Sequence, residues 1–426
     1  MSDFGHQARL IAVDVLKSVF FNKRYLKDSL ERSFHIVELN KRDRAFVRNL
    51  TTTTLRRLGQ IDDLILYCLK KPFQKKNSLK QVLLRIGVCQ LLFLNTSDYA
   101  AISTTVDLAE KLNCTAYKKF INAILRRLQR EGRALLDRQD SVRLNTPDWL
   151  WESWVGAYGA TRARKIAEAN MMEAPLDISY KNESSDQLKI MDSIQMPGGA
   201  YRLVHSGDVR TLFGFEQGFW WVQDAASRLA ITLSGNVFGK DVIDLCAAPG
   251  GKTFYLVCNG ANVTAVDRSE KRIKRLDENL KRLGMKADTV CADSLTWLPK
   301  KRADLVLLDA PCSGTGTLRR NPDIAYLKSP QDLKRLVTLQ TKLFDAAAKM
   351  IKPEGRILFC TCSLQPEEGP EQVRMFLERH PEFKLDRVSA NEVFVNANPS
   401  GMFRSFPYDL PEHGGRDGFF AARLCR

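Results

Sequence analysis

The sequence predicts a multidomain protein with an N-terminal all-α bundle, a small α+β subdomain and a C-terminal α/β domain built on a Rossmann-like sheet. Three observations support this prediction. With 426 residues, the chain is longer than one hydrophobic core usually serves. Apolar residues recur at helical spacing as far as about residue 138, and after residue 240 short β-branched runs alternate with amphipathic helical patterns. We therefore expect domains at 1–140, 141–235 and 236–426.

The helical pattern of the first domain is clearest in two segments. Ile121, Ile124, Leu125 and Leu128 fall on one helical face, while the neighbouring arginines point elsewhere. Residues 82–94 are mostly apolar, as expected of a helix buried inside a bundle.

The second domain is predicted from its boundary and its turns. Thr146-Pro147-Asp148 indicates a linker that ends in a helix start, since proline and an acidic residue both suit the first helical turn. The segment up to residue 235 mixes short helical and strand patterns with turn signals such as Gly198-Gly199. We interpret this segment as the small α+β subdomain.

The C-terminal domain shows a regular alternation of strands and helices. Apolar runs end in small or acidic residues, and each precedes an amphipathic helix, which is typical of a parallel sheet. We expect a last strand at the edge of the sheet over 418–425. The other predicted strands cover residues 242–247, 263–267, 289–291, 305–309 and 356–362.

Composition restricts the class of protein. The chain is 44% hydrophobic and 27% charged, and it contains no apolar run long enough to span a bilayer. Asp14 and Lys17 interrupt the first apolar segment, so we expect a cytoplasmic protein without a signal peptide. Ten cysteines without a Cys-x-x-Cys pair, and five scattered histidines, predict reduced thiols and no metal site.

The basic charge is concentrated in the first domain. The net charge of the chain is +16, of which residues 1–140 contribute +12 and the remaining residues +4. An ordinary solvated helical surface also carries such side chains. An excess this uneven nevertheless favours a nucleic-acid partner, because clustered Lys and Arg bind phosphates by displacing condensed counterions.

A nucleotide-type loop follows the first predicted strand of the C-terminal domain. Its small residues let a ligand approach the backbone, and it opens a helix. A triphosphate-binding P-loop would need glycine at position 246, so ATP hydrolysis is disfavoured. The loop consists of Cys246, Ala247, Ala248, Pro249, Gly250, Gly251, Lys252 and Thr253.

Acidic residues follow the next two strands. Asp267 stands 17 residues after Gly250, close to the offset at which a carboxylate binds ribose hydroxyls in doubly wound folds. Asp293 follows the third strand, where it would face an adenine amino group. Acidic residues also end strands as turn formers, and this alternative explains either residue alone about equally well.

Two cysteines lie at the predicted ends of neighbouring strands. Cys312 follows Asp309 in one loop, and Cys362 ends the next strand. In a doubly wound sheet these three side chains would converge on the ligand crevice. A single free cysteine is more often a packing residue, but loops rich in glycine and proline at a ligand edge are poor places for core residues. We therefore interpret the pair as candidates for thiol chemistry.

Five short motifs occur together in the C-terminal half. They are residues 246–253, 309–316, 319–323, 361–363 and 417–420. Together they resemble the RNA 5-methylcytosine methyltransferases, specifically the bacterial Sun/Fmu type that acts on 16S ribosomal RNA and has a NusB-like N-terminal domain. The resemblance covers nearly the whole chain. Gly369 and Cys360 depart from the family pattern, and neither departure removes a catalytic role.

The resemblance implies a class I methyltransferase domain that uses S-adenosylmethionine as methyl donor. It implies that Cys362 is the nucleophile, that Cys312 assists product release, and that 16S ribosomal RNA is the partner. We expect a monomer with no membrane association. The residues implied to line the cofactor site are Cys246, Ala247, Ala248, Pro249, Gly250, Gly251, Lys252, Asp267, Asp293 and Asp309.

Cytosine chemistry connects these residues. C5 of cytosine is too weak a nucleophile to take a methyl group unaided, so a Cys362 thiolate would first add at C6. We hypothesise that Asp309 contacts N3 and the amino edge of the base, and that Cys312 acts, directly or through water, when the C5 proton leaves. Arg319 and Arg320 are expected to contact RNA phosphate. Cys360 lies on the same side of its strand as Cys362, which leaves it open to a minor share in the thiol chemistry.

Two alternatives remain open at this point. The first is methylation of transfer RNA or DNA, although DNA cytosine methyltransferases usually resemble one another around a single Pro-Cys nucleophile, and the paired cysteines favour RNA. The second is a noncatalytic RNA-binding assembly factor that retains a cofactor fold. The intact thiols and the glycine loop argue against this second alternative.

Overall fold

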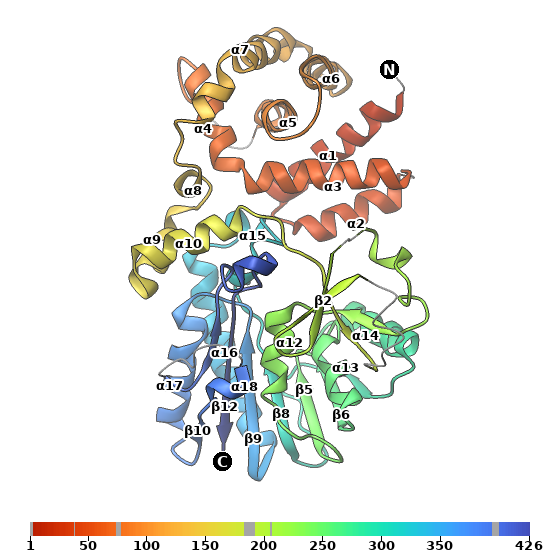
Figure 1. The fold of residues 1–426 in the computed structure, drawn as a ribbon, viewed down its shortest axis with the longest axis vertical. Coiled ribbons are helices and arrows are strands. Elements are labelled where there is room, and N and C mark those ends of the chain that lie inside the picture. Colours follow the sequence, from red (N-terminus) through yellow and green to blue (C-terminus); the bar gives the residue numbers. More distant parts are fainter. Residues whose placement is uncertain (1–2, 38, 74–77, 183–191, 205–206, 394–399) are drawn as a thin grey trace. The chain divides into compact units, whose positions relative to one another are not determined.

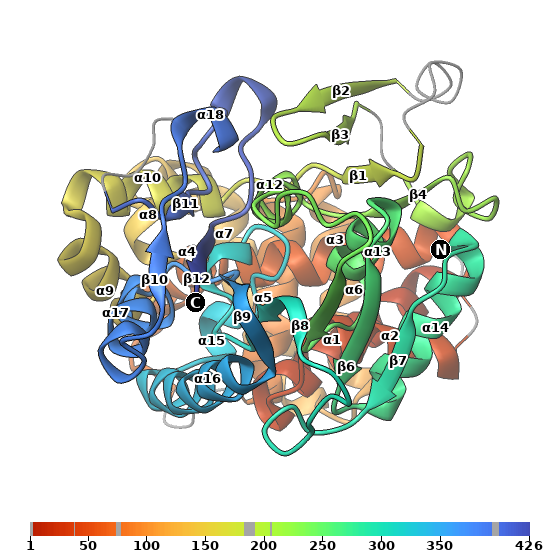
Figure 2. The same cartoon turned by 90° about the horizontal axis from the view of Figure 1, so that it is seen from below.

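The computed structural model describes residues 3–37, 39–73, 78–182, 192–204, 207–393 and 400–426. The chain forms two compact units, and neither is continuous in sequence. The first comprises residues 1–172 and 318–329, and the second comprises residues 173–317 and 330–426. Figures 1 and 2 show their helices and strands.

The described residues of the first unit form helices and no strand, which confirms the predicted all-α fold. Helix α5 packs against α1, α3, α4, α6 and α7, and its residues 82–92 are all buried, as their apolar run predicts. The α-helices of this unit are α1 (Asp3–Asn22), α2 (Leu26–Ile36), α3 (Lys41–Arg56), α4 (Leu58–Cys68), α5 (Leu79–Leu92), α6 (Asp98–Lys111), α7 (Lys118–Leu136), α8 (Ser141–Leu144), α9 (Asp148–Tyr158), α10 (Ala160–Asn170) and α15 (Ile324–Leu327).

Helix α7 has an apolar face and a basic face. The four apolar positions predicted for it are buried in the core of the unit. Lys119, Arg126, Arg130 and Arg133 are exposed, and their spacing of seven, four and three residues places them on the opposite side of the helix. The basic excess of the first domain therefore includes four side chains on one face of α7.

The first unit extends beyond the predicted boundary at residue 140. The amide of Gln60 in α4 donates to Asn145 Oδ1 at 3.1 Å, and Asn145 Nδ2 donates to Gln60 Oε1 at 2.9 Å. A Cβ atom on Gly59 would lie 1.7 Å from the carbonyl oxygen of Leu144, so glycine permits this close packing of α8 on α4. Because these contacts join residues far apart in sequence, the local pattern near residue 140 does not reveal them.

The segment 318–329 completes the first unit. Asp323 Oδ2 accepts a hydrogen bond from the Leu26 amide at 2.8 Å, at the first turn of α2. Arg56 Nη2 donates to the carbonyl oxygen of Arg319 at 2.9 Å. The Arg319 side chain is only 1% exposed, and the phosphate contact expected of it does not fit this burial. Arg320 is half-buried.

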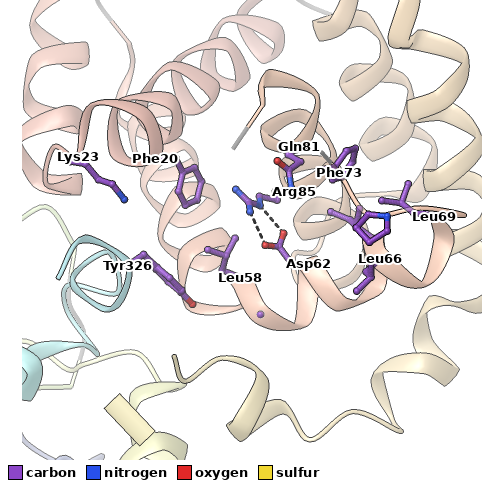
Figure 3. Close-up of a pocket in the computed structure, with 13 residues that line it drawn as sticks. Phe20, Lys23, Leu58, Asp62, Leu66, Leu69, Phe73, Gln81, Arg85 and Tyr326 are labelled. Atoms are coloured by element: carbon purple, nitrogen blue, oxygen red, sulfur yellow. Dashed lines mark hydrogen bonds and ion pairs between the residues drawn. The ribbon is translucent and has the colours of Figure 1, made fainter. Parts of the chain in front are cut away.

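Tyr326, from the same segment, lines a cavity of about 460 Å³ in the first unit. Figure 3 shows Tyr326 opposite Arg85 and Asp62. The side chains of Arg85 and Asp62 form a bidentate ion pair, with both N–O distances at 2.7 Å. The Arg85 guanidinium also lies 4.7 Å from the ring centre of Phe20. The cavity wall therefore combines side chains from α1, α4, α5 and α15.

The second unit begins with a small antiparallel sheet in the order β2-β3-β1-β4. Its strands are β1 (Asp177–Tyr180), β2 (Ser193–Met196), β3 (Ala200–Leu203) and β4 (Trp220–Val222). Arg202 bonds both carboxylate oxygens of buried Asp177, at 2.7 and 2.8 Å. Asp177 also accepts from the Ala225 amide at 3.0 Å, which ties the small sheet to helix α12 (Ala225–Thr232). The predicted subdomain is thus divided, with its first helices in one unit and its strands in the other.

The large sheet has the order β10-β12-β9-β8-β5-β6-β7, with β11 paired to β12. The five strands predicted between residues 242 and 362 all occur, and they run parallel. The predicted edge position of the last strand is wrong, because β12 runs antiparallel between β9 and β10. The strands are β5 (Asp241–Leu245), β6 (Asn262–Asp267), β7 (Asp288–Cys291), β8 (Ala303–Asp309), β9 (Ile351–Thr361), β10 (Lys384–Asp386), β11 (Phe403–Ser405) and β12 (Phe419–Cys425).

Helices cover both faces of the large sheet (Figure 2). Phe359 of β9 stacks on Phe344 of α16, with ring centres 4.6 Å apart. The neighbouring residues Leu358 and Cys360 join the core of the opposite face, beside α12 and α13. The remaining helices are α13 (Gly251–Cys258), α14 (Glu270–Leu283), α16 (Pro330–Met350), α17 (Pro370–Arg379) and α18 (Ala390–Val393), and 3₁₀ turns cover Thr115–Tyr117, Val209–Thr211, Thr315–Thr317, Pro366–Glu368 and Pro411–His413.

Replacing Asp323 by alanine is expected to loosen α2. The substitution removes the acceptor of the Leu26 amide, which should cost about 1 kcal/mol and make the amides of α2 exchange with deuterium roughly fivefold faster. Hydrogen–deuterium exchange of residues 26–36, followed by mass spectrometry, measures this directly. Asp137→Ala, at an exposed position of the same unit, is the matched control. Unchanged exchange in Asp323→Ala would show that the segment 318–329 does not stabilise α2.

Candidate active site

The loops after β8 and β9 bring two thiols together. Cys312 Sγ lies 3.4 Å from Cys362 Sγ, and both residues are half-buried. The Ala310 amide donates to the carbonyl oxygen of Cys360, and the Gly316 amide donates to that of Cys362, each at 3.0 Å. Backbone pairing therefore continues past the strand ends and sets the separation of the two loops.

Gly316 and Gly418 bring a third segment against this pair. The Gly418 amide donates to the carbonyl oxygen of Gly316 at 2.8 Å. A Cβ atom on Gly316 would lie 1.9 Å from the carbonyl oxygen of Gly418. Any larger residue at position 316 would force these backbones apart, so the motif at 417–420 is part of the site because it holds the Cys312 loop in place.

Buried hydroxyl groups connect the two cysteine loops. The hydroxyls of Ser313 and Ser363 lie 3.1 Å apart, and those of Thr315 and Ser363 lie 3.3 Å apart. Thr315 Oγ1 also accepts from the Leu364 amide at 3.0 Å. Because buried polar groups are costly without partners, this network favours one arrangement of the loops.

A buried carboxyl that sequence reasoning did not assign lies beside this network. Glu368 is fully buried, and its two carboxyl oxygens lie 2.8 and 3.1 Å from the Ser313 amide. Burial raises the pKa of Glu368, although hydrogen bonds from Ser313, Ser363 and Gln340 oppose the increase. The position of Glu368 shortly after the Thr-Cys-Ser motif is a local signal that could have found it. Gln340 lies within α16, and nothing in the neighbouring sequence indicates a role for it.

The contact between the thiols changes the acidity of Cys312. The hydrogen bond with the Cys362 sulfur and burial together raise the pKa of the Cys312 thiol well above its ordinary value, and the nearby Glu368 adds to the increase. At neutral pH, Cys312 is therefore a protonated thiol that can donate its S–H to Cys362. Cys360 is fully buried in the sheet core, which leaves it no exposed sulfur for a share in the chemistry.

An ion pair links the loop of residues 246–253 to the end of β8. Lys252 Nζ lies 2.7 Å from Asp309 Oδ2. Burial lowers the pKa of Lys252, but the charge and hydrogen bond of Asp309, together with the nearby Cys360 and Asp244, raise the pKa above its ordinary value. Lys252 is thus cationic at neutral pH, and about a third of the Asp309 side chain, 35%, is exposed.

The loop between β5 and α13 makes a tight turn. Cys246 has a φ of 61° and Gly250 a φ of 111°, both in the left-handed region. A Cβ atom on Gly250 would lie 2.3 Å from the Phe254 ring, so glycine is required for packing as well as for the turn. Below the loop, Thr253 Oγ1 donates to Asp244 Oδ2 at 2.6 Å, and burial raises the pKa of Asp244 to about 7.

The two acidic residues predicted to bind a nucleoside differ in environment. Asp267 is buried at the end of β6, where it accepts from the Ser269 amide at 3.0 Å and pairs with Arg272 at 3.1 Å. Asp293 is exposed after β7 and accepts from the Leu295 amide at 2.9 Å, as a turn former does. Both lie at the carboxyl ends of their strands, as do the loop 246–252, Asp309 and the two cysteines.

Comparison with known proteins assigns the two parts of the sequence. Residues 232–425 match the family described as 16S rRNA methyltransferase RsmB/F, and residues 6–130 match the NusB family. The chain is 35% identical to ribosomal RNA small subunit methyltransferase B of Cronobacter sakazakii, over 98% of both chains. It is 34% identical to the protein of that name from Salmonella paratyphi B, over 90% of this chain and 91% of the relative.

Solved structures share the fold. The crystal structure of PH0851 superposes with a TM-score of 0.79 at 23% identity, and the match covers 100% of this chain and 99% of the other.

Among the described residues, no helix is long and apolar enough to cross a membrane, and no group of three or more His, Cys, Asp or Glu side chains is arranged to hold a metal ion.

Asp244 should make the stability of the protein depend on pH. Its pKa rises from 3.8 to about 7 on folding, so the folded state binds more protons between these values and stability falls as the pH rises through this range. Asp244→Asn removes this titration. Between pH 5 and pH 8, the thermal midpoint of this variant should therefore fall by on the order of 5 °C less than that of the wild type. Thermal unfolding at both pH values measures this, with Asp277→Asn as an exposed control. Equal pH dependence in Asp244→Asn and the wild type would contradict the assignment.

Proposed function

Because the chain belongs to the 16S rRNA methyltransferase RsmB/F family, we propose that it transfers a methyl group from S-adenosylmethionine to C5 of a cytosine in 16S ribosomal RNA, through a covalent adduct with Cys362. The observation that carries this proposal is the 3.4 Å separation of the Cys312 and Cys362 sulfurs. A nucleophile that adds to C6 and a group that later acts at C5 must lie close together, because the two carbon atoms are bonded neighbours.

The residues at the carboxyl edge of the sheet fit S-adenosylmethionine. Carboxylates of Asp267, Asp309 and Asp244 add to the effect of burial in raising the pKa of the Cys246 thiol, so all three lie close to the loop. Lys252 is already paired with Asp309, and Arg272 with Asp267. A site whose cations are already paired with carboxylates suits a sulfonium cation and the donor hydroxyls of a ribose better than a triphosphate.

We assign the loop 246–252, Asp267, Asp293 and Asp309 to the binding of this cofactor. The loop supplies close backbone contact, and the carboxylates of Asp267 and Asp293 supply acceptors for hydroxyl and amino donors. When bound, the cofactor supplies an electrophilic methyl group. Every other step is carried by side chains of the chain itself.

Attack by Cys362 makes C5 nucleophilic. The thiolate forms a bond to C6, the C5–C6 double bond breaks, and electron density moves to C5 and towards N3. The Asp309 carboxylate, paired with Lys252, can accept a hydrogen bond from the exocyclic amino group and another from N3 once N3 has taken a proton from solvent, a proton that N3 returns on release. C5 then takes the methyl group.

Cys312 acts in the release step. Once the Cys362 sulfur is bonded to C6, the strongest cause that keeps Cys312 protonated is removed. Cys312 can then lose its proton to solvent and take the C5 proton, directly or through water. The electron pair of the C5–H bond re-forms the C5–C6 double bond, and Cys362 leaves as a thiolate.

The three cysteine variants test this assignment. Cys362→Ala should lose methyl transfer to unmodified 16S RNA by at least roughly 10³-fold, because the nucleophile is gone. Cys312→Ala should accumulate a protein–RNA adduct that survives denaturation, and Cys360→Ala should behave like the wild type. Labelled S-adenosylmethionine measures methyl transfer, and denaturing gels measure the amount of adduct.

Three outcomes would change the proposal. Methylation by Cys362→Ala at the wild-type rate would refute covalent catalysis by that residue. If the wild type failed to methylate 16S RNA, the same assay on transfer RNA would test the alternative RNA substrate. Failure of the wild type to bind S-adenosylmethionine would favour the noncatalytic assembly factor.

We also propose that residues 1–140 bind the RNA, with Lys119, Arg126, Arg130 and Arg133 on one face of α7 contacting phosphates. The double substitution Arg126→Gln/Arg130→Gln should weaken binding and reduce the slope of log affinity against log salt by about 1.4 to 1.8, since each lost phosphate contact removes about 0.7 to 0.9. Fluorescence anisotropy over a salt series measures the slope. Lys349→Gln, on α16, is the control for loss of a surface charge. An unchanged slope in the double variant would place the RNA elsewhere.

A further inference from the structure

The mechanism above uses neither Glu368 nor Gln340, although both are fully buried beside the two cysteine loops. We propose that these two side chains form a clamp that fixes Cys312 against Cys362, which makes Glu368 a positioning residue for the release step. The structural part of this inference stands on contacts alone, and its catalytic part rests on the proposed function.

The clamp holds the backbone on both sides of Cys312. Ahead of the cysteine, Gln340 Nε2 donates to the carbonyl oxygen of Pro311 at 2.9 Å. After it, the Ser313 amide lies 2.8 Å from Glu368 Oε1 and 3.1 Å from Oε2, and the Ser313 hydroxyl donates to Oε2 at 2.5 Å. With its neighbours held from both sides, Cys312 has little freedom to move away from Cys362.

The two halves of the clamp are joined and supported from outside. Gln340 Nε2 also donates to Glu368 Oε1 at 3.0 Å, so one amide group connects the Pro311 carbonyl to the carboxyl. Gln372, from α17, donates to the carbonyl oxygen of Val337 at 2.8 Å and to Gln340 Oε1 at 3.4 Å. The orientation of Gln340 is thus supported by a second helix as well as by the loops.

Glu368 also reaches the Cys362 loop. Thr361 Oγ1, one residue before the nucleophile, donates to the backbone carbonyl oxygen of Glu368 at 3.0 Å. On the other side of Cys362, the Ser363 hydroxyl lies 3.1 Å from the hydroxyl of Ser313, which is itself bonded to the carboxyl. A single residue therefore contacts the neighbours of both cysteines.

The clamp requires a carboxyl group rather than an amide. The Ser313 amide and Gln340 Nε2 can only donate hydrogen bonds, and both point at Glu368 oxygens. In Glu368→Gln the side chain keeps its size, but in either orientation the new NH₂ group would lie within 3.1 Å of the Ser313 amide, which is itself a donor. Two buried donors that face each other destabilise the arrangement, so the loops should shift.

Formation of a disulfide between Cys312 and Cys362 tests the clamp without any RNA. Diamide takes up the two thiol hydrogens, becomes a hydrazine and leaves an S–S bond, at a rate that depends on how closely the sulfurs are held. The 312–362 disulfide should form at least roughly tenfold more slowly in Glu368→Gln than in the wild type, since misplacement by 1 Å can cost about 10²-fold in a proximity-controlled reaction. Peptide mapping by mass spectrometry identifies the bond.

Matched variants separate positioning from general loss of structure. Glu371→Gln makes the same substitution at an exposed position of α17 and should oxidise like the wild type, and Glu368→Asp should restore part of the rate. Gln340→Met removes the other half of the clamp from α16 and should also slow the reaction, which keeps the test available if Glu368→Gln does not fold. Wild-type oxidation rates in folded Glu368→Gln or Gln340→Met would overturn the proposal.

Single-turnover methylation tests the catalytic part. In Glu368→Gln, release should slow by roughly 10²-fold while adduct formation slows much less, so the adduct should accumulate as in Cys312→Ala. Equal slowing of both steps would reduce Glu368 to a structural role and refute positioning for release. If the wild type formed no adduct while disulfide formation still depended on Glu368, the proposed function would fail and the clamp would stand.

Discussion

The candidate site depends on one constraint, the parallel pairing of β8 with β9. Parallel neighbours end at the same edge of a sheet. The register pairs Asp309 with Cys360, so the loops that follow the two strands begin side by side. Backbone hydrogen bonds from Ala310 and Gly316 extend this pairing into the loops, and the 3.4 Å contact between the Cys312 and Cys362 sulfurs follows from it. The cofactor loop belongs to the same arrangement, because β5 pairs with β8 on its other side.

Burial has different consequences in the two halves of the site. Around the loop 246–253 it raises the pKa of Asp244 to about 7, and it brings the carboxylates of Asp267 and Asp309 close to Arg272 and Lys252, with which they pair. On the thiol side it encloses Glu368 among the Ser313 amide and Gln340 Nε2, which can only donate, and the Ser313 hydroxyl, so both oxygens of the carboxyl have partners. A buried polar network of this kind favours the geometry in which all its groups are paired.

The sequence predicts the parts of the fold that depend on local pattern. Residues 82–92 and the apolar face of α7 lie where their spacing predicts, and the five parallel strands end beside the residues expected at the ligand edge. The internal position of β12, the packing of α8 on Gly59 and the docking of Asp323 on α2 are all contacts between residues far apart in the chain. No local pattern encodes such contacts, and the same is true of Gln340, which acts on Pro311 from the middle of a long helix.

In the mechanism proposed for this site, the arrangement of the thiols also sets the order of the chemical steps. While the Cys362 sulfur is free, its contact keeps Cys312 protonated, so the pair holds one reactive sulfur and one proton donor. In the proposed mechanism, a bond from Cys362 to the base would remove that contact and make Cys312 easier to deprotonate, at the stage when a proton must leave C5. Release would thereby be linked to attack without any movement of the loops. Such a mechanism needs the two sulfurs to stay at a fixed separation, which gives the rigid surroundings of Cys312 a chemical reason.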